Sequence, residues 1–246
     1  MFTEYGKLST MLYEFTKPAG TSIDGDLEYY LEKLQGTSGR ILEAGVGTGR
    51  LLIPLLGAGL TVDGVDISAE MLAQCRQNLQ AHQLSADLFE QDLTKLNLPE
   101  HYQAIVMPTG SFCLLPKAKI AAVLAAFYQQ LTPGGQLIVD LEMPSDFHEG
   151  TTDQATFPLD DHQGIMMTNY HEKIDWFNQK TSTLSKYELI TNGAVTATEL
   201  SHFIMYWYGL NEFEMLLQAA GFSEISHEIG YGKHASEIIT FIARKA

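Results

Sequence analysis

The segment ILEAGVGTGR, which spans Ile41–Arg50, decides how this chain folds. Its apolar start predicts a short strand over residues 40–43, and the apolar run after it predicts a helix. Three glycines at alternate positions let the backbone turn tightly and keep side chains away from a ligand lying across the strand end. The segment therefore predicts a strand, a ligand-binding loop and a helix in succession, with the loop glycines Gly45, Gly47 and Gly49.

Two carboxylates accompany this loop. Glu43 lies two positions before the first glycine, and Asp66 ends the next predicted strand, over residues 61–65, in the segment VDGVDIS. A carboxylate at the tip of that strand can accept hydrogen bonds from both hydroxyls of a ribose. Asp66 therefore indicates a nucleoside ligand, although it is also placed to cap a helix that begins near Ser68.

The residue after the last glycine separates two classes of nucleoside ligand. A dinucleotide fingerprint has glycine or alanine there, so that the helix N-terminus can approach a pyrophosphate. This chain has Arg50 instead. The charge of Glu43 would repel phosphate but can hold an ammonium group. We therefore expect a ligand with a ribose, an amino-acid end and no phosphate, which describes S-adenosylmethionine.

Strand and helix patterns alternate around this unit, after two helices predicted in the first forty residues. Alternating strands and crossover helices imply a parallel sheet covered on both faces. The segment TPGG, at 132–135, predicts a turn between a helix and the next strand. Further strands are predicted over residues 86–90, 102–107, 136–143, 222–229 and 236–243.

Residues 145–207 carry a different pattern. Alternating runs over 164–174, 179–191 and 194–205 predict antiparallel strands, and Asn192-Gly193 suits a two-residue hairpin turn between the last two. We therefore predict a Rossmann-like domain and an inserted antiparallel β lid. The domain comprises 1–144 and 208–246, with 1–39 as a helical N-terminal cap, and the lid comprises 145–207.

Composition excludes several classes of protein. The 246 residues include 15 Lys plus Arg and 30 Asp plus Glu, so the net charge of −15 disfavours a nucleic-acid partner. No apolar stretch reaches the roughly 20 residues of a membrane span, so we expect no membrane partner. Cys75 and Cys113 have no metal-ligand or redox spacing, and we expect no metal and a cytoplasmic location. The oligomeric state is left open.

The chain resembles the Rossmann-like (class I) S-adenosylmethionine-dependent methyltransferases, in their small-molecule branch. The family motif, acidic-x-Gly-x-Gly-x-Gly, is complete over residues 43–49, and EQDLTKL, AIVMPTGSF and LTPGG are similar to later family segments. The resemblance covers residues 40–143 and 208–246. It implies a doubly wound α/β fold with a mostly parallel seven-stranded sheet of order 3-2-1-4-5-7-6, the last strand antiparallel and the β insertion after strand five.

The resemblance also implies roles for individual residues. Glu43 and the glycines would line the methionine half of the cofactor, and Asp66 would hold its ribose. The backbone at Met107 and Pro108 would receive the methionine ammonium. Tyr13, in LYEF, corresponds loosely to a cofactor contact in a helix that closes over the site. The adenine would be met by Ile67, Met71, Asp92 and Leu93, although Asp92 also suits a turn or cap.

Three functions remain open on these residues. The first is methyl transfer to a nitrogen or oxygen of a small-molecule acceptor, by in-line displacement with the inserted sheet selecting the substrate. The segment MPTGSF lacks the Pro-Pro-aromatic run of DNA adenine methylases. The second is a non-catalytic S-adenosylmethionine-binding accessory or sensor protein. The third, a nicotinamide-dependent oxidoreductase, is disfavoured by Arg50.

No residue is predicted to be catalytic, because the sulfonium already activates the methyl group. Alignment of the acceptor with the methyl–sulfur bond can then supply the rate acceleration. A hydroxyl acceptor would need a base, such as a carboxylate or a histidine of the insertion (His148, His171 or His202). Asp140 and Glu142, at a predicted strand end, either hold a cationic substrate or face water.

Overall fold

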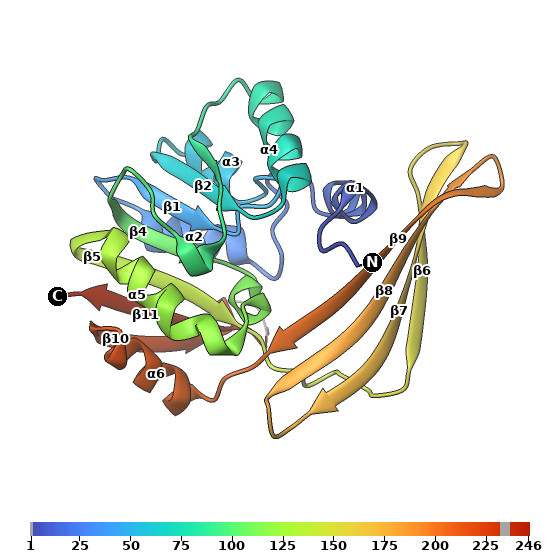
Figure 1. The fold of residues 1–246 in the computed structure, drawn as a ribbon. Helices are drawn as coiled ribbons and strands as arrows, with labels where there is room; N and C mark the ends of the chain where they lie inside the picture. The colour runs from blue at the N-terminus through green and yellow to red at the C-terminus, as the bar shows by residue number, and fades with distance from the viewer. Residues whose placement is uncertain (1, 232–236) are drawn as a thin grey trace.

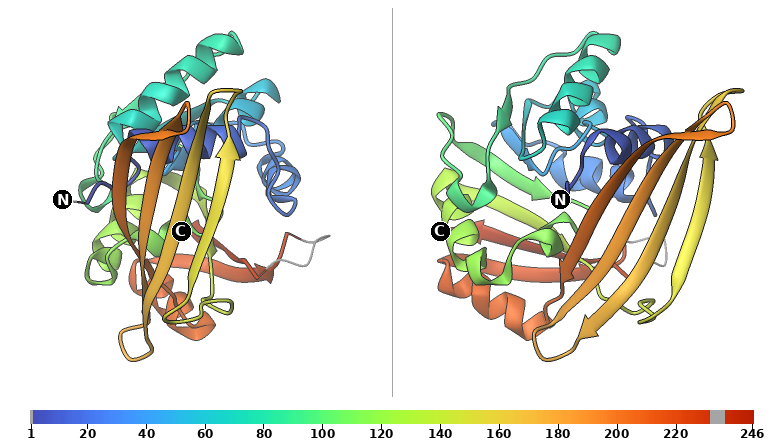
Figure 2. Two further views of the ribbon diagram at one scale, coloured as in Figure 1. Left: turned by 90° about the vertical axis from the view of Figure 1, so that its right-hand side faces the viewer. Right: turned by 45° about the vertical axis from the view of Figure 1, so that its right-hand side comes forward.

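The computed structural model describes residues 2–231 and 237–246. Within these residues, seven strands form one sheet with helices on both faces, and four strands form a second sheet beside it (Figure 1). The two further views in Figure 2 show the second sheet as a long, twisted layer that stands apart from the first. Helix α1 (Lys7–Thr16) lies between them, in contact with α4 (Ala69–Ala81) and with the second sheet.

The larger sheet has the strand order β3-β2-β1-β4-β5-β11-β10. Pairing is parallel from β3 to β5, and β11 is antiparallel to both of its neighbours. The predicted fold class, order and antiparallel last strand are therefore confirmed. The strands are β1 (Ile41–Ala44), β2 (Val62–Asp66), β3 (Leu88–Glu90), β4 (Tyr102–Met107), β5 (Leu131–Leu141), β10 (Phe222–Ile229) and β11 (Ile239–Lys245).

Two apolar clusters hold helices against the two faces of this sheet. One cluster contains Leu52 and Leu72, and the other contains Val123 and Phe213. The helices of the first face are α2 (Asp26–Leu34), α3 (Leu52–Gly57) and α4, and those of the second are α5 (Ile120–Gln130) and α6 (Leu210–Ala219). No helix in the described ranges is long and apolar enough to cross a membrane.

The second sheet is formed within residues 145–207. Its order is β6-β7-β8-β9 and every pair is antiparallel. The strands are β6 (Thr152–Pro158), β7 (Gln163–Asp175), β8 (Lys180–Thr191) and β9 (Ala194–Tyr206). The Asn192-Gly193 turn joins β8 and β9 with φ of 50° and 80°, as a two-residue hairpin turn requires. The edge strand β6 is not predicted by the sequence because its side chains are largely exposed and show no apolar alternation.

The segment TPGG differs from its prediction. It does not separate α5 from the next strand, because β5 begins at Leu131 and runs through these residues. The pairing with β4 shifts there, from Tyr102↔Leu131 to Ala104↔Gln136. The extra residues on β5 are therefore a bulge inside a strand, and Gly134 accommodates it with a φ of +73°. Ser236, the predicted start of the last strand, lies outside the described residues.

Candidate active site

The glycine loop after β1 is tied to the end of β2. Gly45 and Val46 both donate their backbone N–H groups to the carbonyl oxygen of Val65, over 2.8 and 3.0 Å. Gly47 donates its N–H to Oδ2 of Asp66 over 2.9 Å. The structure thus brings the predicted loop and the predicted carboxylate together at the carboxyl edge of the sheet, where doubly wound folds bind ligands.

Glu43 is a buried carboxylate with an unsatisfied oxygen. Its side chain is 3% exposed, and Oε2 has no hydrogen-bond partner. Burial raises the pKa of Glu43 to about 8, although Arg50 opposes this. A buried carboxylate without a partner is costly, and a cationic donor would remove that cost. The site therefore fits an ammonium group next to the glycine loop.

Asp66 accepts hydrogen bonds at both of its oxygens. Oδ1 accepts from the N–H of Ser68 and Oδ2 from that of Gly47, each over 2.9 Å. Burial raises the pKa of Asp66, and these backbone donors oppose the rise. Ser68 itself caps α4, because its hydroxyl accepts from the N–H of Met71. Asp66 thus steadies the turn into α4, and its carboxylate still has acceptor capacity for a further donor.

The three loop glycines face different surroundings. A Cβ on Gly47 would meet no atom within 4 Å, and one on Gly45 would lie 3.7 Å from Met107. A Cβ on Gly49 would lie 2.8 Å from Sγ of Cys75 in α4. Gly47 therefore borders open space beside the loop, Gly45 lies in ordinary contact distance of Met107, and Gly49 allows the loop to pack against α4.

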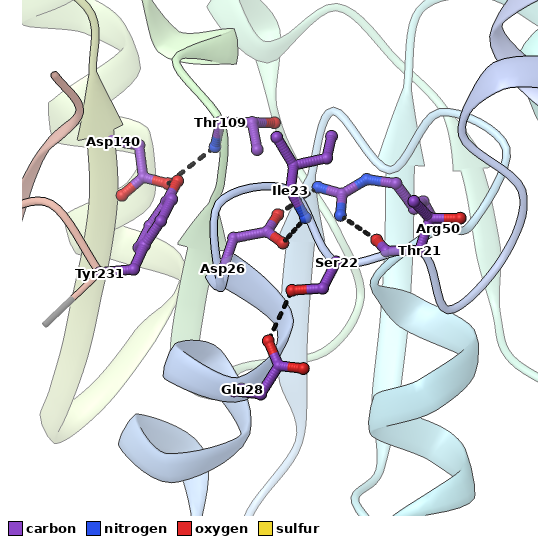
Figure 3. Close-up of polar contacts among 9 residues, drawn as sticks. All are labelled: Thr21, Ser22, Ile23, Asp26, Glu28, Arg50, Thr109, Asp140 and Tyr231. Atoms are coloured by element: carbon purple, nitrogen blue, oxygen red, sulfur yellow. Dashed lines mark hydrogen bonds and ion pairs between the residues drawn. The ribbon is translucent and has the colours of Figure 1, made fainter. Parts of the chain in front are cut away.

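Arg50 turns away from the loop into the protein. Its guanidinium group forms an ion pair with Oδ2 of Asp26 over 2.5 Å and donates to the Thr21 carbonyl over 2.7 Å (Figure 3). Both side chains of the pair are buried. Burial raises the pKa of Tyr13, and its hydrogen bond to Arg50 opposes the rise. Arg50 thus holds the segment before α2 and meets Tyr13 of α1, while its Nε stays unpaired.

The predicted adenine contacts are spread over the ends of β2 and β3. Ile67 is 67% exposed, whereas Met71 and Leu93 are buried. Asp92 accepts a hydrogen bond from the N–H of Thr94 over 2.8 Å and caps the 3₁₀ turn η1 (Leu93–Lys95). This bond lowers the pKa of Asp92. The local cap role of Asp92 is therefore present, and Ile67 offers the exposed apolar surface beside Asp66.

The loop after β4 is fixed by Asp140 at the end of β5. Met107 and Pro108 are buried, and the next residue, Thr109, donates its N–H to Oδ2 of Asp140 over 2.7 Å. Thr109 has a φ of +51°, which is unusual for a β-branched residue and typically costs about 1–3 kcal/mol. Tyr231 donates its hydroxyl to the same carboxylate oxygen over 2.6 Å (Figure 3).

A cavity of about 640 Å³ lies beside this loop. Tyr13, Thr109 and Tyr231 line it from the larger sheet and α1, and Phe203 lines it from β9. A smaller cavity of about 220 Å³ adjoins it under the inserted sheet. Both cavities share Glu142, Asp146, Met205 and Glu237. The sequence-predicted insertion therefore faces the carboxyl edge of the sheet across a partly acidic cavity.

The three histidines of the insertion have different surroundings. His171 lines the smaller cavity, and its Nε2 lies 2.8 Å from Oδ2 of Asp153. Nε2 of His202 lies 2.6 Å from Oε2 of Glu172. The carbonyl oxygen of His148 accepts a hydrogen bond from a neighbouring threonine. Among them, His171 is the histidine placed at a cavity.

Sequence reasoning missed two of these residues and left a third open. Asp26 and Tyr231 carry no motif, and their partners come from remote parts of the chain. Asp140 is 0% exposed, so the water-exposed alternative for this residue is wrong. Its oxygens accept from protein donors, whereas Glu142 lines both cavities. A carboxylate in an otherwise apolar strand was the signal for Asp140.

Comparison with known proteins agrees with this geometry. Residues 41–135 match the methyltransferase domain family. A glycine/sarcosine N-methyltransferase of Halorhodospira halochloris is 38% identical over 120 residues, 48% of this chain and 44% of that protein. The chain matches less than half the length of the first curated relatives.

Solved structures resemble the chain over nearly its whole length. The sugar N-methyltransferase KedS8 of Streptoalloteichus sp. ATCC 53650 has a TM-score of 0.78 at 17% identity, covering 100% of this chain and 95% of that one. An S-adenosylmethionine-dependent methyltransferase of Clostridium acetobutylicum ATCC 824 has a TM-score of 0.74 at 18% identity, covering 95% and 96%.

The chain therefore has the fold of the class I S-adenosylmethionine-dependent methyltransferases. Its residues 41–135 match a methyltransferase domain, and a solved structure of the same fold, an amino pentose methyltransferase of Micromonospora echinaspora, contains bound S-adenosylmethionine.

Proposed function

We propose that the chain transfers a methyl group from S-adenosylmethionine to the nitrogen of a small amine. The observation that carries this proposal is the buried, unpartnered oxygen of Glu43 beside an open glycine loop. A cofactor with an ammonium group on its amino-acid end would give that oxygen a partner. Asp66, at the end of the neighbouring strand β2, offers hydrogen-bond acceptors for a ribose.

The remaining cofactor contacts are proposed from the resemblance. Gly45, Gly47 and Gly49 would form the loop around the methionine half, and the Met107–Pro108 backbone would accept from its ammonium. Ile67, Met71, Asp92 and Leu93 would enclose the adenine. Tyr13 would cover the site from α1. When bound, S-adenosylmethionine supplies a methyl group that its sulfonium already activates.

The chain's own contribution is to hold an acceptor in line with that methyl group and to exclude water. Orientation of this kind can supply roughly 7–11 kcal/mol without a protein nucleophile. The cavity of about 640 Å³ between the loop after β4 and strand β9 is the acceptor site in this proposal. The inserted sheet, residues 145–207, is its lid and selects the acceptor by shape.

The charge of the cavity wall favours an acceptor that is methylated on nitrogen over one that is methylated on oxygen. Among the described residues that line the cavity, Asp24, Glu142, Asp146 and Glu237 are acidic and Lys17 is the one cation. Burial lowers the pKa of Lys17 and raises that of Glu142. A wall of this kind attracts an ammonium form, and a carboxylate can then accept the proton that the nitrogen must lose. One similar protein is named a glycine/sarcosine N-methyltransferase, and another is named a sugar N-methyltransferase.

Turnover of amine acceptors tests this function. The purified chain is incubated with S-adenosylmethionine and with glycine, sarcosine and a set of amino sugars, each matched by its hydroxyl analogue. Mass spectrometry should find one added methyl group on an amine and none on the matched hydroxyl compound.

The accessory or sensor alternative predicts another outcome. If S-adenosylhomocysteine binds but no compound of the amine set gains a methyl group, amine methylation is wrong and the binding function remains. Methylation of hydroxyl compounds alone would reverse the choice of nitrogen.

A further inference from the structure

The turn after β4 has an unfavourable local conformation. Ser111 donates its N–H to the Pro108 carbonyl over 3.3 Å, which closes a four-residue turn. Its two central residues, Thr109 and Gly110, have φ of +51° and +70°. Turns with two left-handed central residues favour asparagine and glycine, and threonine is a poor choice because its side chain is branched at Cβ. The conformation of Thr109 must therefore be held by contacts outside the turn.

Asp140 provides the contact that holds it. Its Oδ2 accepts the N–H of Thr109 over 2.7 Å and the hydroxyl of Tyr231 over 2.6 Å. Its Oδ1 accepts the hydroxyl of Thr240 over 2.6 Å. Asp140 is 0% exposed, so protein donors and not bulk water surround its carboxylate. Figure 3 shows the carboxylate between the Thr109 amide and the Tyr231 ring.

Glycine is also required at the second turn position. A Cβ on Gly110 would lie 2.9 Å from Oε2 and 3.1 Å from Cβ of Glu142. The turn is thus pressed against the end of β5 at two points, Asp140 and Glu142. Thr109 and Gly110 both line the cavity of about 640 Å³, and they directly follow the Met107–Pro108 backbone.

We propose that Asp140 is a positioning residue for methyl transfer. It holds the Thr109–Gly110 turn in its left-handed conformation and so fixes the direction of the Met107–Pro108 backbone toward the cofactor. The part that concerns the cofactor rests on the proposed function, whereas the part that concerns the turn does not. Tyr231 and Thr240 tie the same carboxylate to the C-terminal strands.

The test combines a variant that breaks the contact with one that makes the contact unnecessary. In Asp140→Asn, a neutral amide oxygen replaces the charged acceptor of the Thr109 N–H and the NH2 group faces the Thr240 hydroxyl, so the hydrogen bond to Thr109 is weakened. We expect hydrogen exchange of the Thr109 amide in the cofactor-free protein to rise by about tenfold, because a hydrogen bond to a charged acceptor is stronger than one to a neutral amide. S-adenosylhomocysteine should bind about tenfold more weakly by calorimetry.

Thr109→Gly separates positioning from a general structural role. Glycine adopts the left-handed conformation without support, so Asp140→Asn should weaken binding by less than about threefold when it is combined with T109G. The matched control, Thr240→Val, removes another donor to Asp140 and should leave the Thr109 amide protected. Equal losses with and without T109G would overturn the proposal, as would an unchanged Thr109 exchange rate in D140N.

Two further results are also informative. If D140N does not fold, the exchange rate of the Thr109 amide in the wild-type chain decides, because fast exchange there would rule out the bond to Asp140. If the wild-type chain binds no S-adenosylhomocysteine, the proposed function fails, while the exchange measurements still decide whether Asp140 holds the turn.

Discussion

Buried carboxylates dominate the site at the scale of single residues. Burial raises the pKa of Glu43 to about 8 and that of Asp140 to about 6. Asp140 has three protein donors, whereas one oxygen of Glu43 has none. The hydrogen bonds of Asp140 stabilise the fold, whereas the unpartnered oxygen of Glu43 can bind a donor group of a ligand.

Glu43 should therefore make stability fall with pH in the cofactor-free protein. Its folded pKa is above the ordinary value of 4.5, so folding favours the protonated form, and this advantage is lost as pH rises from about 4.5 to about 8. Glu43→Gln has no charge to bury. Between those pH values, the unfolding free energy of the wild type should fall by about 4 kcal/mol more than that of E43Q.

Urea denaturation across this pH range measures the difference. Asp140 is present in both proteins, so its contribution cancels. Parallel pH profiles for the two proteins would mean that Glu43 is not a buried, unpaired carboxylate.

Sequence could identify some of these residues and not others. Glu43 and Asp66 were predictable because they stand at fixed positions around a glycine loop. Asp26 was not predictable, and the role of Asp140 stayed open, because these roles depend on Arg50 and Thr109, which approach the two carboxylates only in the folded chain.

Helix α1 connects the two sheets at the scale of elements. The residue before it, Gly6, has no side chain that could cap its first turn. Glu199 of β9 replaces the cap, since its carboxylate accepts from the N–H of Leu8 over 2.9 Å and from the hydroxyl of Ser9 over 2.7 Å. The inserted sheet thus holds the helix that carries Tyr13 into the cavity.

Glu199→Ala should loosen α1 from both sheets. Loss of a helix cap typically costs about 1 kcal/mol, so we expect faster hydrogen exchange in α1 and several-fold weaker binding of S-adenosylhomocysteine. Asp160→Ala is the matched control, because it removes a carboxylate that caps backbone N–H groups in the β6–β7 turn. If both variants behave alike, α1 does not depend on the insertion.

The predicted elements were most accurate where one face is buried. Strands β4 and β10 have the predicted bounds, because each has apolar residues that pack on a helix layer. Strand β6 escaped prediction because nothing packs on its exposed residues. The bulge at TPGG escaped because proline and glycine also favour turns, and only pairing with β4 places them in a strand.

The whole molecule places an acidic cavity between its two sheets. Sequence alternation predicted both sheets, and the family resemblance implied the strand order of the larger one. It could not predict the cavity, because the cavity depends on how β9 and α1 lie against the end of β5. The choice of acceptor molecule therefore depends on the shape of the assembled cavity, which no single sequence motif determines.

Calorimetric titration of the wild-type chain with S-adenosylhomocysteine tests the central claim most directly, with Asp66→Ala measured beside it. We predict saturable binding at one site, and at least about tenfold weaker binding to D66A, because that variant loses a charged acceptor for the ribose. Absence of heat from the wild-type chain, or equal affinity of the two proteins, would contradict a nucleoside site between Glu43 and Asp66.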